Sequence, residues 1–202
     1  MPYSQFGSLQ QVRQQLGITT TFRPLLTNLV PVAPSAWLLQ TLEKFTQRRL
    51  AYFSEKSRSE ALVFPILAEL QERHQYRFSL YSGAIIEADK ALGLNGECDF
   101  VLSRGEQSIE VERPICSIVE AKDNNLDVGI PQCIAQLVGA RLFNEKEGLA
   151  TPLLFGAVTT GTEWVFLKLE GSVVVIDTEF YSLKSLPELL GALDAVIREL
   201  AL

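Results

Sequence analysis

Two carboxylates and a lysine near the middle of the chain have the side chains that chemistry on phosphate requires. Asp99 lies in the alternating segment ECDFVL, and Glu120 and Lys122 lie at the end of the apolar run ICSIVEAK. Strand side chains alternate between the two faces of a sheet, so Glu120 and Lys122 are expected to point to the same side. If the two strands are neighbours, Asp99 can lie beside Glu120.

The types of these residues favour metal-assisted chemistry. Two carboxylates can hold Mg²⁺ through oxygen while leaving coordination positions for water and phosphate. A bound cation lowers the pKa of its water and neutralises charge on the phosphate. Lys122 adds a positive charge that can orient the attacking water or stabilise the transition state. Two ordinary alternatives remain: Glu120 and Lys122 as a solvated strand end, and Asp99 as an acid bonded to backbone.

The elements that must position these residues follow from hydrophobic periodicity and from turn residues. An irregular arm is expected over 1–34, with one short helix near 8–16, because several prolines interrupt it. Helices are expected over 36–53, 57–73 with a kink at Pro65, 131–143 and 185–200. Strands are expected over 76–88, 97–102, 115–121, 152–158, 164–169 and 173–177, with a turn at 92–96 and the last three strands in an antiparallel meander. This order predicts an α/β domain around a mixed sheet.

The composition suits one globular domain, or one domain with a small appendage. The chain has 202 residues, 47% hydrophobic and 21% charged, with a mean hydropathy of +0.14. These values leave enough chain for a sizeable core and are unlike those of a disordered protein. No apolar run approaches the roughly 20 residues that span a bilayer. The start, MPYSQFGSLQQVRQQ, has no apolar signal-peptide core, which predicts a cytoplasmic protein.

The few cysteines and the single histidine exclude several classes of metal site and a disulfide framework. Cys98, Cys116 and Cys133 form neither a disulfide framework nor a CxxC zinc motif. One histidine cannot supply a His-rich metal site or an H-E-x-x-H zincin. That histidine, His74, lies in the polar stretch QERHQYR, which predicts a solvated side chain. If the chain is an enzyme, carboxylates and lysine carry its chemistry.

The charge is distributed unevenly along the chain. Residues 1–58 hold seven basic and two acidic residues, a net charge of +5, against −6 for the whole chain and therefore −11 for the remainder. The acidic total argues against nonspecific coating of nucleic acid but allows a local basic surface. Arg48, Arg49, Lys56 and Arg58 are expected to form a positive rim beside the acidic site. The aromatic residues before them, such as Trp37 and Phe53, are expected in the core.

The pattern D-(x20)-E-A-K, formed by Asp99, Glu120, Ala121 and Lys122, resembles the signature of the PD-(D/E)xK nuclease superfamily. The resemblance covers roughly residues 55–160. It departs from the motif in one place, since Cys98 replaces the proline before Asp99. The resemblance implies a restriction-endonuclease-like α/β core, α-β-β-β-α-β, with a mixed sheet flanked by helices. The N-terminal helical extension over 1–54 and the C-terminal antiparallel strands plus helix lie outside that core, within a nuclease domain assigned to 55–202.

The same resemblance implies roles for individual residues. Asp99 and Glu120 would bind Mg²⁺, or Mn²⁺ as a substitute, and Lys122 would orient the attacking water. Glu60 would add an acid from the first core helix, and Gln136, with Gln132 on the same helical face, would face the site. Glu97, two residues from Asp99, is a reserve ligand.

The implied activity is hydrolysis of phosphodiester bonds in nucleic acid, with DNA as the expected partner, no membrane, and a homodimer allowed. One alternative is a domain of the same fold that binds a partner or nucleic acid without cutting it, and another is an unrelated α/β domain in which E-A-K occurs by chance.

Overall fold

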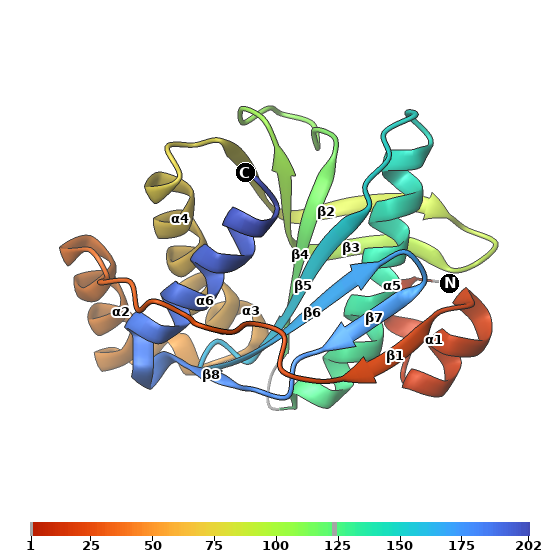
Figure 1. Cartoon of the computed structure of the whole chain (residues 1–202). Coiled ribbons are helices and arrows are strands. Elements are labelled where there is room, and N and C mark those ends of the chain that lie inside the picture. The colour runs from red at the N-terminus through yellow and green to blue at the C-terminus, as the bar shows by residue number, and fades with distance from the viewer. Residues whose placement is uncertain (1, 123–124) are drawn as a thin grey trace.

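One mixed β-sheet forms the centre of the molecule in this computed structural model, which describes residues 2–122 and 125–202 (Figure 1). Its strands are β1 (Thr19–Phe22), β2 (Phe78–Asp89), β3 (Leu94–Arg104), β4 (Ile115–Ala121), β5 (Leu153–Thr159), β6 (Glu163–Glu170), β7 (Val173–Ile176) and β8 (Tyr181–Ser182). They lie in the order β1-β7-β6-β5-β4-β3-β2, with β8 beside β6. The pairs β4–β5 and β1–β7 are parallel and the others are antiparallel. The expected α/β class with a mixed sheet is confirmed.

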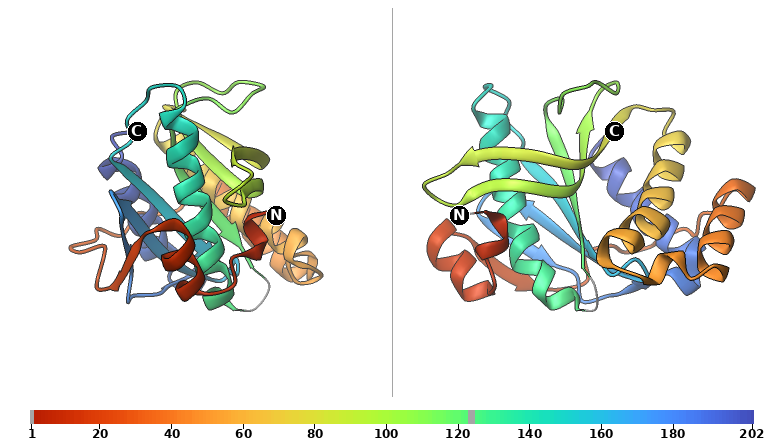
Figure 2. Two further views of the ribbon diagram at one scale, coloured as in Figure 1. Left: turned by 90° about the vertical axis from the view of Figure 1, so that its right-hand side faces the viewer. Right: turned by 180° about the vertical axis from the view of Figure 1, so that it is seen from behind.

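Helices cover both faces of this sheet, and each face has its own buried core (Figure 2). On one face lie η1 (Tyr3–Gln5), α1 (Leu9–Leu16) and α5 (Leu126–Glu145). On the other lie α2 (Ala36–Gln47), α4 (Phe64–Arg73) and α6 (Leu186–Glu199), together with the short helices η2 (Leu50–Tyr52) and η4 (Leu183–Ser185). No helix in the described ranges is long and apolar enough to cross a membrane.

Strand β4 and the meander β5–β6–β7 match the expected strands closely, whereas β1 was missed. The residues of β1 are mostly exposed, so no hydrophobic alternation marks them. Backbone pairing with the edge strand β7, from Thr19–Val173 to Phe22–Ile176, forms this strand. The turn expected at 92–96 is also shorter, because β3 already begins at Leu94.

The helical segment that leads into the sheet starts earlier than expected and contains a wider turn. It comprises α3 (Glu55–Arg58), the π-helical η3 (Ser59–Val63) and α4. Ser54 caps the first turn in a capping box with Ser57. Pro65 lacks an amide hydrogen and its ring crowds the preceding turn, which accounts for the π turn just before it. The expected helix over 36–53 ends at Gln47, and η2 separates it from α3.

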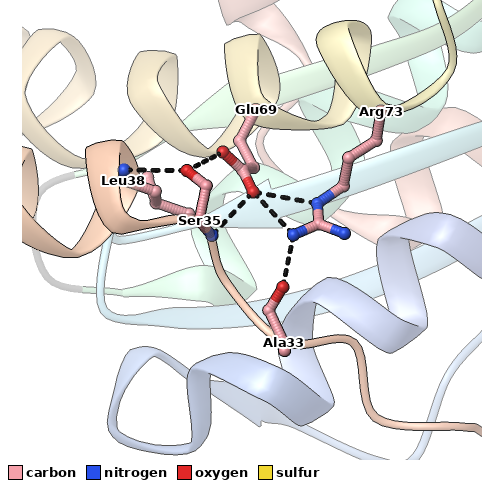
Figure 3. A network of polar contacts seen from close by, with 5 residues as sticks. All are labelled: Ala33, Ser35, Leu38, Glu69 and Arg73. Atoms are coloured by element: carbon pink, nitrogen blue, oxygen red, sulfur yellow. Dashed lines mark hydrogen bonds and ion pairs between the residues drawn. The ribbon is translucent and has the colours of Figure 1, made fainter.

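A buried carboxylate joins α2 to α4 (Figure 3). Glu69 accepts hydrogen bonds from the amide and hydroxyl of Ser35 at 3.0 and 2.6 Å and from Arg73 Nε at 2.9 Å. Ser35 Oγ also accepts the Leu38 amide at 3.1 Å, and Arg73 donates to the Ala33 carbonyl. Burial opposes the charge of Glu69, but the hydrogen bonds from Ser35 and Arg73 outweigh it and lower its pKa. This network fixes the start of α2 on α4.

His74 is buried rather than solvated, so the expectation for it is wrong. Its Nε2 lies 2.9 Å from Asp194 Oδ1 on α6, and Asp194 also pairs with Arg198 at 2.8 Å. The polar residues around His74 did not indicate this burial, because the helix that covers it, α6, is distant in the sequence. The expected start of the next helix at Pro131 is wrong as well, since Asn125 caps α5 and Pro131 lies inside it.

Candidate active site

Strand β4 carries Glu120 into the interior at its carboxyl end. All seven residues of Ile115–Ala121 are buried, and Glu120 is 2% exposed. Antiparallel pairing with β3 ends at the Phe100–Val119 pair, next to both acids, and the Ala121 amide beside Glu120 donates to Asp99 Oδ2 at 2.7 Å. The hairpin geometry therefore brings together two acids that are 21 positions apart in the sequence.

The buried carboxylate of Glu120 is held on both oxygens. Lys122 Nζ lies 2.6 Å from Oε1, and Gln136 Nε2 on α5 donates to Oε2 at 2.7 Å. Gln136 is fully buried, and its Oε1 has no hydrogen-bond partner among the described residues. Glu120 is therefore not a solvated strand end, and we call these three side chains the buried cluster.

Gly129 on α5 leaves room for the aliphatic part of the Lys122 side chain. A Cβ at Gly129 would lie 2.5 Å from Val158 Cγ1 and 2.9 Å from Lys122 Cγ. Any larger residue would displace one of these neighbours, so Gly129 is a positioning residue for Lys122 that the sequence analysis missed. A glycine inside a helical pattern was the available signal.

Asp99 lies at a bend in the β2–β3 hairpin. Pairing runs from Ser82–Phe100 to Ala84–Cys98 and leaves Gly83 across from Asp99. Phe100 contributes to the core on the α4 side and Cys98 to the core on the α5 side, although alternation would give both the same face. Gly83 permits the bend because its φ is +68°. A lone glycine inside a strand pattern is the signal that could have predicted it.

The carboxylate of Asp99 accepts a backbone hydrogen bond and also faces a cavity. Its Oδ2 accepts the Ala121 amide at 2.7 Å, which is the backbone bond considered as an alternative from the sequence. The same side chain also lines a cavity of about 230 Å³. The residues around this cavity are Glu55, Lys56, Ser59, Glu60, Ser82, Gly83, Glu97, Asp99 and Ala121. Among the described residues, Glu120 and Lys122 do not line it.

The helical segment contributes two acids to this cavity, and they differ in their influence on Asp99. Glu60, the acid expected from the sequence, is 66% exposed and pairs at 4.0 Å with Lys56. Glu55 was not expected, yet its charge raises the pKa values of both Asp99 and Lys122. Its position in the first turn after the Ser54 cap was the signal that it would enter the site from a helix end.

Burial and nearby negative charges raise the pKa values of both central acids. Burial and the Asp99 charge raise the pKa of Glu120 to about 7, although Lys122 and Gln136 act against them. Burial likewise raises the pKa of Asp99, with Glu55 and Glu97 adding to the effect. Burial opposes the charge of Lys122, but its ion pair with Glu120 outweighs this and raises its pKa.

The donor set fits a cation that keeps much of its water. Within residues 2–122 and 125–202, no group of three or more His, Cys, Asp or Glu side chains is arranged to hold a metal ion. Mg²⁺, however, is commonly bound by only one or two carboxylates together with water and phosphate. Burial and, to a smaller extent, repulsion by neighbouring acids raise the Asp99 and Glu120 pKa values, and a divalent cation would relieve that repulsion. The unpartnered Gln136 Oε1 offers an acceptor for water.

The remaining expected residues are dispersed. Lys56 lines the cavity, whereas Arg58 lines a second cavity with Asn125 and Phe180. Arg48 and Arg49 are exposed but line neither of these two cavities. Of the four basic residues expected to form the rim, only Lys56 therefore lines the cavity with Asp99, and the four do not form one continuous row. The reason is that α2 ends at Gln47, so these residues do not share one helix.

No protein-family model matches the chain, and a search of curated proteins finds no match to it. Function therefore has to be inferred from the residues of the site and their geometry.

Proposed function

We propose that the chain is a divalent-metal-dependent phosphodiesterase that hydrolyses nucleic acid, with DNA as its substrate. One observation carries the proposal: at the end of a buried strand, Glu120 is held by Lys122 at 2.6 Å and by Gln136 at 2.7 Å, while the adjacent Ala121 amide holds Asp99 at 2.7 Å. Burying a carboxylate beside a second acid is costly, and structures retain such an arrangement mainly at functional sites.

The order of the elements supports the resemblance to PD-(D/E)xK nucleases. The helical segment from α3 to α4 precedes the antiparallel strands β2, β3 and β4, and α5 then leads to β5 parallel to β4. This order agrees with the α-β-β-β-α-β order that the resemblance implies, in which Asp99 would lie on the second core strand and Glu120 at the end of the third, and it supports the proposal.

Each residue of the site has a separate part in the proposed reaction. Asp99 and Glu120 would hold the cation, and the Ala121 amide and Gln136 fix the directions of their carboxylates. The cation would supply charge neutralisation and a water of lowered pKa. Lys122 supplies a fixed positive charge for the phosphate or the attacking water. Gln136 Oε1 has no hydrogen-bond partner among the described residues, and it could accept a hydrogen bond from that water and so help to orient it.

A second candidate function is a non-cutting module of the same fold. It is favoured by the closed ion pair, because Lys122 already occupies one oxygen of Glu120 and Gln136 the other. In that case the lysine would act as a permanent substitute for the cation, and the cluster would be purely structural.

Cleavage of labelled DNA separates these two functions. We expect the wild-type chain with Mg²⁺ or Mn²⁺ to cut DNA, and chelation with EDTA to stop the reaction. Asp99→Asn should lose activity, whereas Glu87→Gln, an exposed acid on β2 paired with Lys90, should retain it. Metal binding without cleavage of DNA or RNA, or cleavage that survives Asp99→Asn, would contradict the proposal.

A further inference from the structure

The segment that precedes the cavity exposes aromatic side chains that were expected in the core. Phe53 is 91% exposed and Tyr52 is 50% exposed, and Leu50 in the same short helix is 51% exposed. The buried member of this turn is Ala51. The expectation of core packing is therefore wrong for Phe53, and it is also wrong for Trp37, which is 49% exposed. Several exposed apolar side chains that follow one another in a single turn, unlike isolated ones, mark a candidate binding surface.

These rings lie next to the candidate active site. The turn η2 packs against α2, α3 and η3. Phe53 and Ser54 connect η2 directly to Glu55 and Lys56, which line the cavity with Asp99. The capping box of Ser54 and Ser57, with hydrogen bonds of 2.8 and 3.1 Å, holds this connection in one conformation. The aromatic residues are thus presented from a defined backbone at one end of the cavity lining.

Basic residues flank the same rings along the chain. Arg48 and Arg49 immediately precede η2 and are exposed, and in the described part of the chain neither forms an ion pair. Lys56 follows two residues after Ser54, and its side chain is 85% exposed, with only a distant pairing to Glu60 at 4.0 Å. Basic residues interleaved with exposed aromatic rings are the pattern that binds an unpaired nucleic-acid strand.

We propose that Arg48, Arg49, Tyr52, Phe53 and Lys56 form a binding segment for single-stranded nucleic acid. The bases stack on Phe53 and Tyr52, and the cations contact the phosphates, which leads the strand into the cavity at Asp99. Stacking needs the open face of a base, which a continuous duplex does not present. This inference rests on the proposed nuclease function for its substrate, and it specifies that substrate as an unpaired strand or an unpaired end.

Binding without metal tests this inference separately from catalysis. Fluorescence anisotropy in EDTA compares a labelled single-stranded oligonucleotide with the duplex of the same sequence. We expect the single strand to bind more tightly. Phe53→Ser should weaken single-strand binding about tenfold, since loss of one stacking contact has an effect of this order. Duplex binding should hardly change. Tyr76→Ser is the matched control, because Tyr76 is 61% exposed just beyond the other end of α4.

A charge variant tests the phosphate contacts. Arg48→Ala with Arg49→Ala should reduce the slope of log affinity against log salt by about 1.4 for the single strand, equivalent to about two phosphate contacts. Lys90→Ala, on the β2–β3 turn, should leave this slope unchanged. Phe53 and both arginines are exposed, so folding is expected to survive, and melting curves of the variants verify it.

Three results would overturn the inference. They are equal affinity for single strand and duplex, single-strand binding that Phe53→Ser leaves intact, and a wild-type dimer that Phe53→Ser dissociates. The last would show that a second copy of the chain covers the rings. If single-strand binding behaves as expected but no cleavage occurs with metal, the binding segment stands and the nuclease function fails.

Discussion

The candidate site has two halves that the fold treats differently. The buried cluster of Glu120, Lys122 and Gln136 lies between β4 and α5, with each contact within 2.7 Å. The acids of the cavity come from the helical segment and from β3, and Glu60 is 66% exposed there. Asp99 belongs to both halves, because the Ala121 amide anchors it while its side chain lines the cavity.

Charges in the two halves therefore interact with different strength. In the buried half, low polarity strengthens each interaction and makes an unpaired group costly. In the open half, water and salt screen the acids, so each one contributes less. We therefore expect large effects from changes in the buried cluster and small effects from changes around the cavity.

The largest effect is expected at Lys122. Lys122→Gln can still donate a hydrogen bond to Glu120 but carries no charge, so kcat for DNA cleavage should fall about 10²–10³-fold. Metal binding, measured by calorimetry with Mn²⁺, should persist. Lys90→Ala serves as the control, as an exposed lysine paired at 3.0 Å with Glu87. Loss of metal binding and cleavage together would assign Lys122 a structural role only.

The second largest effect is expected in the stabilisation that a divalent cation gives to the folded chain. A cation at about 100 times its dissociation constant stabilises the folded chain by about 2.7 kcal/mol. Thermal melts with and without Mg²⁺ should show this gain for the wild type and for Glu87→Gln. Asp99→Asn and Glu120→Gln should remove it. A gain of the same size in Glu120→Gln would place the cation elsewhere.

The buried acid should also make metal-free stability depend on pH. Because the pKa of Glu120 is about 7 against an ordinary 4.5, the folded chain binds the extra proton between these values. The free energy of unfolding should therefore fall as pH rises from about 5 to 8, by about 1–3 kcal/mol. In EDTA, Glu120→Gln should flatten this dependence and melt higher than the wild type at pH 8, while Glu60→Gln should follow the wild type. A wild-type free energy of unfolding that rises over this pH range would contradict the raised pKa of Glu120.

The smallest effect should distinguish the two acids of the helical segment. The Glu55 charge raises the Asp99 pKa, whereas Glu60 is not among the causes of that shift. We expect Glu55→Gln to change the apparent affinity for Mn²⁺ by a few-fold, in line with a screened charge. Glu60→Gln should change it less, and calorimetry on the two variants compares them directly. The reverse order would restore Glu60 as the accessory acid.

Hydrophobic patterns in the sequence predicted the strands that carry the central acids. The continuous apolar run of 115–121 has the bounds of β4, and the alternating segment around Asp99 lies within β3. The adjacency of Asp99 and Glu120 followed from pairing of consecutive strands, which is common. Gln136 was reached through the family resemblance, and the structure sets it on Glu120.

Contacts between distant segments could not be predicted in the same way. Strand β1 exists because β7 offers it an edge, and His74 is buried because α6 supplies Asp194. Glu55 lines the cavity with Asp99 because the helical segment starts at Glu55, two residues before the expected position. For β1 and His74 the deciding partner is far along the chain, and no periodicity in the nearby sequence indicates it.

The central claim is that Asp99 and Glu120 hold one divalent cation together. The most direct measurement is a crystal structure of the chain soaked in Mn²⁺, with the ion located by its anomalous scattering. We expect one peak between the two side chains, about 2.1–2.2 Å from an oxygen of each, and a loosened contact between Lys122 and Glu120. A peak coordinated only by Glu55, Glu60 or Glu97, or no peak while Lys122 stays on Glu120, would contradict the account.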